Sequence, residues 1–82
     1  MELAREERAV LCSLYNKCSP TTHCHLPGEY IVKALPRHAR GHGWKALEKL
    51  RRRGLIYQKG GTDSYGLTRE GINMAREICR ED

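Results

Sequence analysis

Phenylalanine is absent from this 82-residue chain, and aromatic residues make up only 6% of it. A hydrophobic core must therefore be built mainly from leucine, isoleucine, valine and alanine. The chain also lacks any apolar run of about 18 residues, which excludes a membrane-spanning helix. Its first ten residues mix acids and bases without an apolar stretch, so we expect no secretory signal peptide. A chain of this length predicts one domain over residues 1–82, which is too small for a large enzyme cleft.

The usual components of a catalytic site are missing as well. There is no phosphate-binding loop, no pair of carboxylates in an apolar setting and no Ser/His/Asp pattern. Cys24 lies between two histidines, but a short connection without a pocket is a poor setting for a nucleophile. The Gly60–Gly61 pair is better explained as a turn than as a nucleotide loop. We therefore expect a binding protein without a cofactor, not an enzyme.

Positive charge is concentrated in one block of the chain. Residues 33–59 contain nine basic side chains and a single acid, a net charge of +8, whereas the segments on either side are slightly acidic. The whole chain carries +5. Such a polarised distribution favours a polyanionic partner, with nucleic acid as the first candidate.

Four segments have the periodicity or the boundary residues of helices. They cover residues 2–17, 28–35, a third segment from Gly41 or Gly43 to Arg53, and 69–79. Pro36 ends the second helix, and Gly54 ends the third. Residues 36–43 (PRHARGHG) between these two helices read as a turn.

The remaining pattern predicts a β-hairpin. Residues 55–58 and 65–67 are β-like and are separated by a turn that contains two glycines. Thr68 is suited to cap the final helix. A short extended piece is also compatible with residues 22–25. The fold class is therefore α+β and mainly α, in the order helix, helix, helix, hairpin, helix.

Two stretches carry a family resemblance: ALEKLRRRGLIYQ at residues 46–58 and YGLTREG at residues 65–71. They resemble the recognition helix, first wing strand, returning strand and final helix cap of winged helix-turn-helix regulators of the MarR, ArsR and PadR kinds. This resemblance covers about 50 residues. It implies a three-helix core, a β-hairpin wing and a C-terminal helix, and a sequence-specific transcriptional regulator that binds double-stranded DNA.

A major groove accepts one helix, whose outward side chains reach the base edges. The wing then lies over the DNA backbone. On this basis we expect the major-groove contacts to come from Arg40, His42, Lys45 and Lys49. We expect the phosphate contacts to come from Arg37, Arg52, Arg53, Lys59 and Thr62.

The start of the third helix departs from the family pattern. Gly43 stands where an aliphatic anchor is expected, and two nearby glycines predict a first turn that stays loose until DNA orders it. Trp44 either covers the edge of the core, contacts a sugar or base, or joins a dimer contact. The glycine-containing entry is also weakly similar to a winged-helix protein of the small ribosomal subunit. RNA and a protein partner therefore remain alternative targets.

Cysteine usage leaves several interpretations open. Without a secretory signal, we expect a cytoplasmic protein with free, reduced thiols that act as small apolar residues. A disulfide is the first alternative, either Cys18–Cys24 or one involving Cys12 or Cys79, as in intracellular proteins of hyperthermophiles. A zinc site is the second and weaker alternative, because no second pair of ligands accompanies the first cluster. Its candidate ligands are Cys18, His23, Cys24 and His25.

The final helix predicts a partner surface. Its apolar arc extends through Met74 and Ile78 and is wider than one small core needs. Regulators of this kind are commonly two-fold dimers that read two half-sites. We therefore expect a homodimer built on Met74 and Ile78, with help from the first helix near Cys12.

Overall fold

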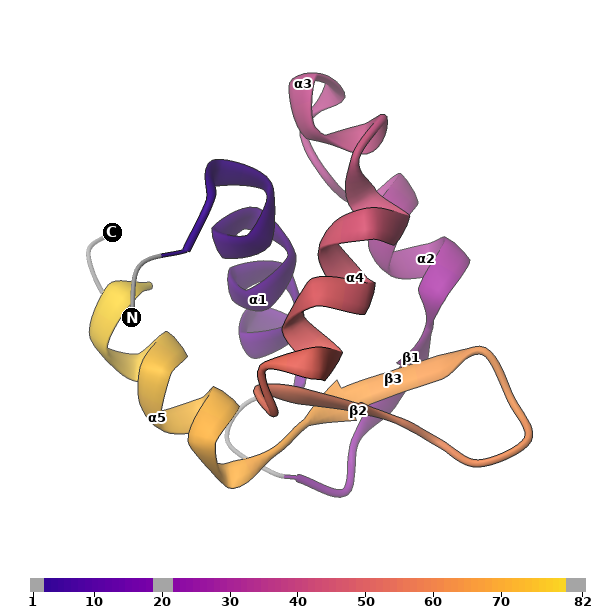
Figure 1. Ribbon diagram of the computed structural model, residues 1–82, viewed down its shortest axis with the longest axis vertical. Helices are drawn as coiled ribbons and strands as arrows, with labels where there is room; N and C mark the ends of the chain where they lie inside the picture. The colour runs from indigo at the N-terminus through magenta and orange to yellow at the C-terminus, as the bar shows by residue number, and fades with distance from the viewer. Residues whose placement is uncertain (1–2, 19–21, 80–82) are drawn as a thin grey trace.

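A computed structural model describes residues 3–18 and 22–79. Over these residues the chain is α+β and mainly helical, with five helices and one three-stranded antiparallel sheet (Figure 1). The elements are α1 (Arg5–Cys18), β1 (His25–Pro27), α2 (Gly28–Lys33), α3 (Arg37–Arg40), α4 (Gly43–Arg52), β2 (Ile56–Gln58), β3 (Ser64–Leu67) and α5 (Arg69–Ile78).

The helices confirm most of the expected boundaries and correct some of them. α1 begins at Arg5 and continues to Cys18, so it starts later and ends later than the periodicity predicted. α2 ends at Lys33 and is followed by Ala34 as its C-cap. The expected turn at residues 36–43 contains the short helix α3, which was missed because a single turn is too short to show periodicity. α4 begins at Gly43, the later of the two predicted starts.

The sheet confirms the predicted hairpin and adds a third strand. β2 and β3 pair antiparallel, with Tyr57 opposite Gly66. β1 lies on the other side of β3, so the strand order is β1-β3-β2. This strand begins at His25, where the predicted extended piece at residues 22–25 ends. Its three residues form a strand because they pair antiparallel with β3, with Leu26 opposite Tyr65.

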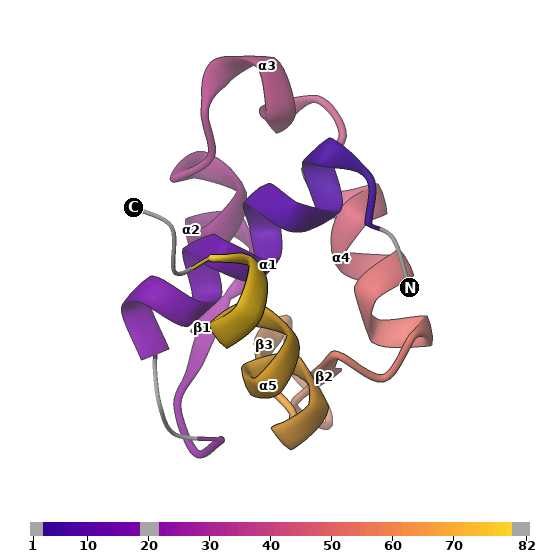
Figure 2. The ribbon, with the colours of Figure 1, turned by 90° about the vertical axis from the view of Figure 1, so that its left-hand side faces the viewer.

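The core consists mainly of aliphatic side chains, as the absence of phenylalanine predicted. α1 lies between α4 and α5 and contacts both (Figure 1), and α5 lies in front of α1 in Figure 2. Six of the largest core side chains have no exposed surface: Leu11, Leu14, Ile31, Leu47, Leu50 and Leu67. α4 packs against the core with one side only, so its outer side remains on the surface. The hairpin turn is also exposed.

The junction of hairpin and α5 explains the residues Thr68 and Gly71 of the motif. As predicted, Thr68 is the N-cap, and its Oγ1 accepts a hydrogen bond from the Gly71 amide at 3.0 Å. The same hydroxyl donates to the Gly54 carbonyl at 2.7 Å. A side chain at Gly71 would overlap the Leu55 carbonyl oxygen, so this position requires glycine. These contacts fix the direction in which the chain leaves the hairpin.

The prediction of free thiols is wrong. All four cysteines are paired, Cys12 with Cys79 and Cys18 with Cys24, at Cα–Cα distances of 5.7 and 5.5 Å. The first disulfide joins α1 to the residue that ends α5 across 67 positions of sequence. The second joins the end of α1 to the segment before β1. Sequence reasoning named the second pair as an alternative, but only the fold brings Cys12 and Cys79 together.

Gly43 is buried at a close approach of two helices, which accounts for a glycine at this position. A Cβ at this position would lie 2.9 Å from both Cγ atoms of Val32 and 3.2 Å from a Leu35 methyl group. Val32 and Leu35 thus fill the space that an aliphatic anchor on α4 would occupy. In this structure α4 is formed from Gly43 onward, and the expectation that its first turn is loose until DNA orders it stays a prediction.

We expect Gly43→Ala to lower the free energy of unfolding by about 1–2 kcal/mol, although alanine favours helices. The reason is overpacking against Val32, a β-branched residue with little rotamer freedom. Urea denaturation measures the effect. Gly41→Ala is the matched control, because its Cβ would meet nothing within 4 Å and its φ is −63°. A Gly43→Ala protein as stable as this control would contradict the close-approach account.

Candidate nucleic-acid interface

α4 is amphipathic, and its outer side carries three of the nine predicted contacts. Its buried side consists of Gly43, Ala46, Leu47 and Leu50. The periodicity of the helix places its basic residues on the opposite side, where they are exposed: Lys45, Lys49 and Arg52. The burial that holds α4 against α1 therefore also directs these three cations into solvent.

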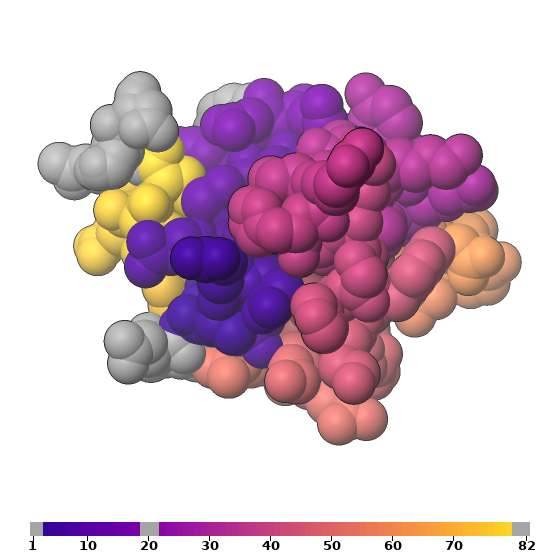
Figure 3. All heavy atoms as spheres, turned by 90° about the horizontal axis from the view of Figure 1, so that it is seen from above, coloured from indigo at the N-terminus to yellow at the C-terminus, as the bar shows by residue number. Residues whose placement is uncertain are grey.

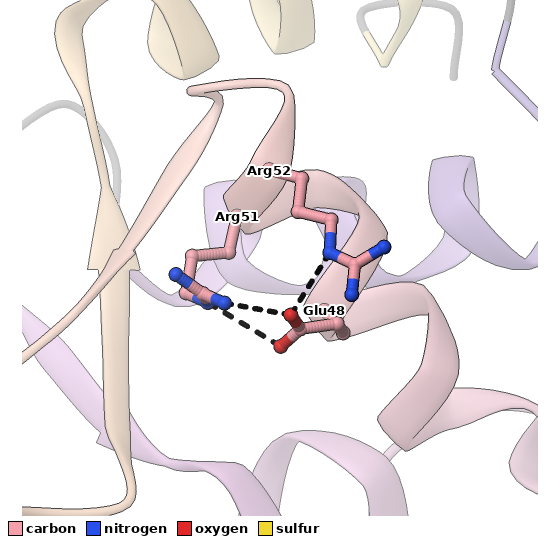
Figure 4. Close-up of polar contacts among 3 residues, drawn as sticks. All are labelled: Glu48, Arg51 and Arg52. Atoms are coloured by element: carbon pink, nitrogen blue, oxygen red, sulfur yellow. Dashed lines mark hydrogen bonds and ion pairs between the residues drawn. The ribbon is translucent and has the colours of Figure 1, made fainter.

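Glu48 lies among these cations and is held by two arginines (Figure 4). Arg51 donates from Nε to Oε1 at 3.3 Å and from its terminal nitrogen to Oε2 at 2.6 Å. Arg52 donates from Nε to Oε2 at 3.1 Å. The hydrogen bond from Arg51 is the main reason that the pKa of Glu48 is lowered, and the same bond raises the pKa of Arg51. The cluster carries a net charge of +1 and keeps its carboxylate ionised.

One end of α4 is flanked by acids of α1. A shallow pocket of about 60 Å³ lies between the two helices, with Glu6 and Glu7 on one wall and His42, Lys45 and Lys49 on the other. Glu7 is buried and accepts a hydrogen bond from the Ala4 amide at 3.0 Å. These acids reduce the local positive potential on this side of α4.

Arg53 has a structural partner that the sequence did not reveal. One terminal nitrogen of its guanidinium lies 3.7 Å from Oε1 of the buried Glu7. The contact joins the C-cap of α4 to the first turns of α1. Arg53 was predicted to bind phosphate, and this remains a prediction, although part of its charge is already compensated by Glu7.

The entry to α4 contains three more of the predicted contacts. Arg37 and Arg40 are exposed on α3, and His42 is the exposed N-cap residue of α4. Arg40 donates from Nε to the Leu35 carbonyl at 3.1 Å, which ties α3 to the end of α2. The terminal nitrogens of its guanidinium are the groups that a ligand would contact.

The hairpin turn presents Lys59 and Thr62 at the surface. Gly61 has a positive φ of 72°, which explains the glycine there. The Thr62 hydroxyl donates to the Lys59 carbonyl at 3.0 Å and accepts from the Ser64 amide at 3.1 Å. The Thr62 hydroxyl therefore helps to shape the turn. To donate its proton to a phosphate, as predicted, it would have to give up its hydrogen bond to the Lys59 carbonyl. Lys59 is the exposed cation of this turn.

Trp44 covers the edge of the fold and is also half exposed. Its ring lies against Gly28, where an added Cβ would come within 2.6 Å of the indole, and Tyr65 lies at the same place. The exposed fraction of the side chain is 50%. The expectation that Trp44 covers the core edge fits this contact with Gly28, whereas contact with a sugar or base stays a prediction.

Sequence reasoning missed Arg51 as part of this surface. It lines the groove between α4 and the hairpin, together with Gln58, Lys59 and the two glycines of the turn. Tyr65 lies close enough for Arg51 and Glu48 to influence it, and burial raises its pKa. Helical spacing assigned no contact to Arg51, and only the position of the hairpin shows that this residue borders a groove.

The surface of α5 is less open than its apolar arc suggested. Met74 and Ile78 are half-buried and pack against the core of their own chain. Cys79, which follows them, is bonded to Cys12 on α1. The predicted homodimer is untested, but these contacts leave it a smaller apolar surface.

The alternative of a zinc site is wrong for the residues proposed. The sulfur atoms of Cys18 and Cys24 are bonded to each other and so are not thiolate ligands. Within residues 3–18 and 22–79, no group of three or more His, Cys, Asp or Glu side chains is arranged to hold a metal ion.

The resulting surface runs from α3 along α4 to the hairpin turn. Seen from above, the hairpin and α5 lie at opposite sides of the molecule, with α3 and α4 between them (Figure 3). No helix among the described residues is long and apolar enough to cross a membrane. Comparisons with family models, curated proteins and solved structures found no match for the chain.

Proposed function

We propose that the protein is a winged-helix transcriptional regulator that binds double-stranded DNA, with α4 in the major groove and the β2–β3 hairpin on the backbone. The observation that carries this proposal is the placement of charge. Much of the +8 block of the sequence is exposed: Lys45, Lys49 and Arg52 lie on the outer side of α4, and Lys59 lies in the hairpin turn that follows. DNA binding without catalysis requires exposed cations of this kind and no catalytic residues.

The element order supports the same proposal. A helix, a short strand, three helices, a hairpin and a final helix follow one another, with β1 completing the sheet beside β3. This order agrees with the winged-helix resemblance of residues 46–58 and 65–71. The helix that precedes the hairpin is the one that would enter the groove, and α4 holds this position with its basic side outward.

Dimensions of the groove also favour α4 as the DNA-reading helix. A major groove about 12 Å wide accepts a single helix, and α4 has ten residues with an uninterrupted outer side. In this arrangement Lys45 and Lys49 reach the base edges and adjacent phosphates. Arg37, Arg52 and Lys59 contact the phosphates on either side.

The proposal includes a homodimer on DNA and a location in the cytoplasm. Two copies related by a two-fold axis would read two half-sites, with Met74 and Ile78 of α5 at the contact. A cytoplasmic protein with two disulfides fits a hyperthermophile, in which intracellular disulfides persist. An oxidising compartment outside the cytoplasm would also preserve both disulfides. Locating the protein in cells by fractionation distinguishes this compartment from the proposed cytoplasm.

The proposal is tested by fluorescence anisotropy on random duplex DNA, with salt varied from about 0.05 to 0.3 M. The expected result is binding that weakens linearly on a log–log plot. We expect Lys59→Ala to reduce the slope by about one unit and to weaken binding evenly across sequences, because one phosphate contact is lost. Arg69→Ala on α5 is the control and should leave the slope unchanged.

Other outcomes would replace the proposal. An absence of duplex binding at the lowest salt would favour a protein-interaction module. Tighter binding to a structured RNA than to duplex DNA would favour the RNA-binding alternative. A change in sequence preference without a change in slope would mean that Lys59 reads bases and that the hairpin enters a groove.

A further inference from the structure

We propose that Glu48 reads a base: its carboxylate accepts a hydrogen bond from the exocyclic amino group of cytosine (N4) or adenine (N6) in the major groove. The inference rests on the proposed binding of duplex DNA by α4. It gives a function to the one acidic residue of the basic block, whose presence phosphate binding does not explain.

Glu48 is chemically different from the rest of this surface. It is the only acid in residues 33–59. Its neighbours Lys45, Lys49 and Arg52 only donate hydrogen bonds, so they suit phosphates and the O6 and N7 acceptors of guanine. An ionised carboxylate only accepts, and the matching donors in the major groove are the amino groups of cytosine and adenine.

The geometry keeps the carboxylate in place and leaves it reachable. Three hydrogen bonds from Arg51 and Arg52 fix its orientation before any ligand arrives. A carboxylate offers about four acceptor positions, so three donors do not saturate it. Oε1 receives only the longest of these bonds, at 3.3 Å from Arg51 Nε. The Glu48 side chain is 42% exposed, so this oxygen can still meet a donor from solvent.

The guanidinium groups of Arg51 and Arg52 also offset the repulsion between the Glu48 carboxylate and the DNA phosphates. A single carboxylate would be repelled by the phosphates, whereas the cluster of Glu48, Arg51 and Arg52 carries a net positive charge. Hydrogen bonding from Arg51 lowers the pKa of Glu48, which keeps the carboxylate an acceptor at neutral pH. Stability alone is a weak reason for the cluster, because exposed ion pairs within one helix add little to it.

The test is selection from a library of randomised DNA duplexes, with sequencing of the bound fraction. The wild type should enrich cytosine or adenine at one position by about fivefold or more, the range of a direct base contact. The base enriched decides between the two amino groups. Glu48→Ala should lose this preference while its overall affinity for the library stays the same or rises.

Two further variants separate base reading from general charge effects. Glu48→Gln carries an amide that both donates and accepts, so it should shift the preference toward adenine. Glu29→Gln is the matched control, because it makes the same charge change in an i,i+4 ion pair of α2 with Lys33. The control should retain the wild-type preference.

The outcomes distinguish this inference from the proposed function. If the wild type binds the library and Glu48→Ala selects the same bases, the inference is overturned and duplex binding stands. If the wild type binds no duplex at low salt, both fail together. Thermal unfolding of each variant checks that a lost preference does not come from a lost fold.

Discussion

Replacing Lys45 and Lys49 together by glutamate is expected to lower the affinity for duplex DNA at least ~100-fold in about 0.1 M salt. Both side chains are exposed on the outer side of α4. Each lost contact to a phosphate or base edge is worth roughly 1.4 kcal/mol or more, which is tenfold in affinity. Charge reversal also adds repulsion from the phosphates, so the combined loss should exceed that of two alanine substitutions.

The fold should tolerate this change at a small cost. Lys45 and Lys49 line the pocket that Glu6 and Glu7 share, so two new glutamates would place like charges there. Positions 45 and 49 are exposed, so solvent screening weakens the repulsion, and the buried Glu7 keeps its contact with Arg53. Circular dichroism and urea denaturation of the double variant should therefore give a folded protein that is slightly less stable than the wild type.

A matched control distinguishes the loss of contacts on α4 from the effect of a lower net charge. Arg69→Glu/Arg76→Glu changes the net charge by the same amount at exposed positions of α5, outside the proposed interface. We expect this control to lose severalfold in affinity at most, because charges beyond about 10 Å are screened. Equal losses for the two double variants would show that α4 is not the binding helix.

The sequence predicted those parts of the fold that depend on local pattern. The apolar periodicity of α1, α4 and α5 arises because each buries one side of a helix, and this leaves a signal at every third or fourth residue. Thr68 was identified as a cap because an N-cap hydroxyl acts on an amide only three residues away. The hairpin was visible because its strands are joined by a short turn with two glycines.

What the sequence missed depends on contacts between distant segments. β1 has three residues, and only its pairing with β3, about 40 positions away, makes it a strand. Gly43 was interpreted as a defect because its close neighbour Val32 lies on another helix. Arg53 was assigned to phosphate because nothing in its own segment indicates the buried Glu7. The candidate site was therefore predicted as a set of cations, without the partners that some of them already have.

The second large effect concerns the disulfide between α1 and the end of α5. We expect Cys12→Ala/Cys79→Ala to lower the free energy of unfolding by about 4 kcal/mol, because the cross-link closes a loop of 67 positions and so restricts the unfolded chain. For an 82-residue domain with a small core, such a loss is a large part of the total stability. Urea denaturation under oxidising conditions measures it.

The other disulfide provides the matched control for this account. Cys18→Ala/Cys24→Ala opens a loop of only six positions, so the same entropy argument predicts a smaller loss of about 2 kcal/mol. Cys18 is buried, which adds a packing cost to the control and works against the predicted order. If the short-loop variant is nevertheless the more stable of the two, loop closure accounts for the difference. If the order is reversed, packing around the sulfur atoms in the native state contributes more to stability than loop closure does.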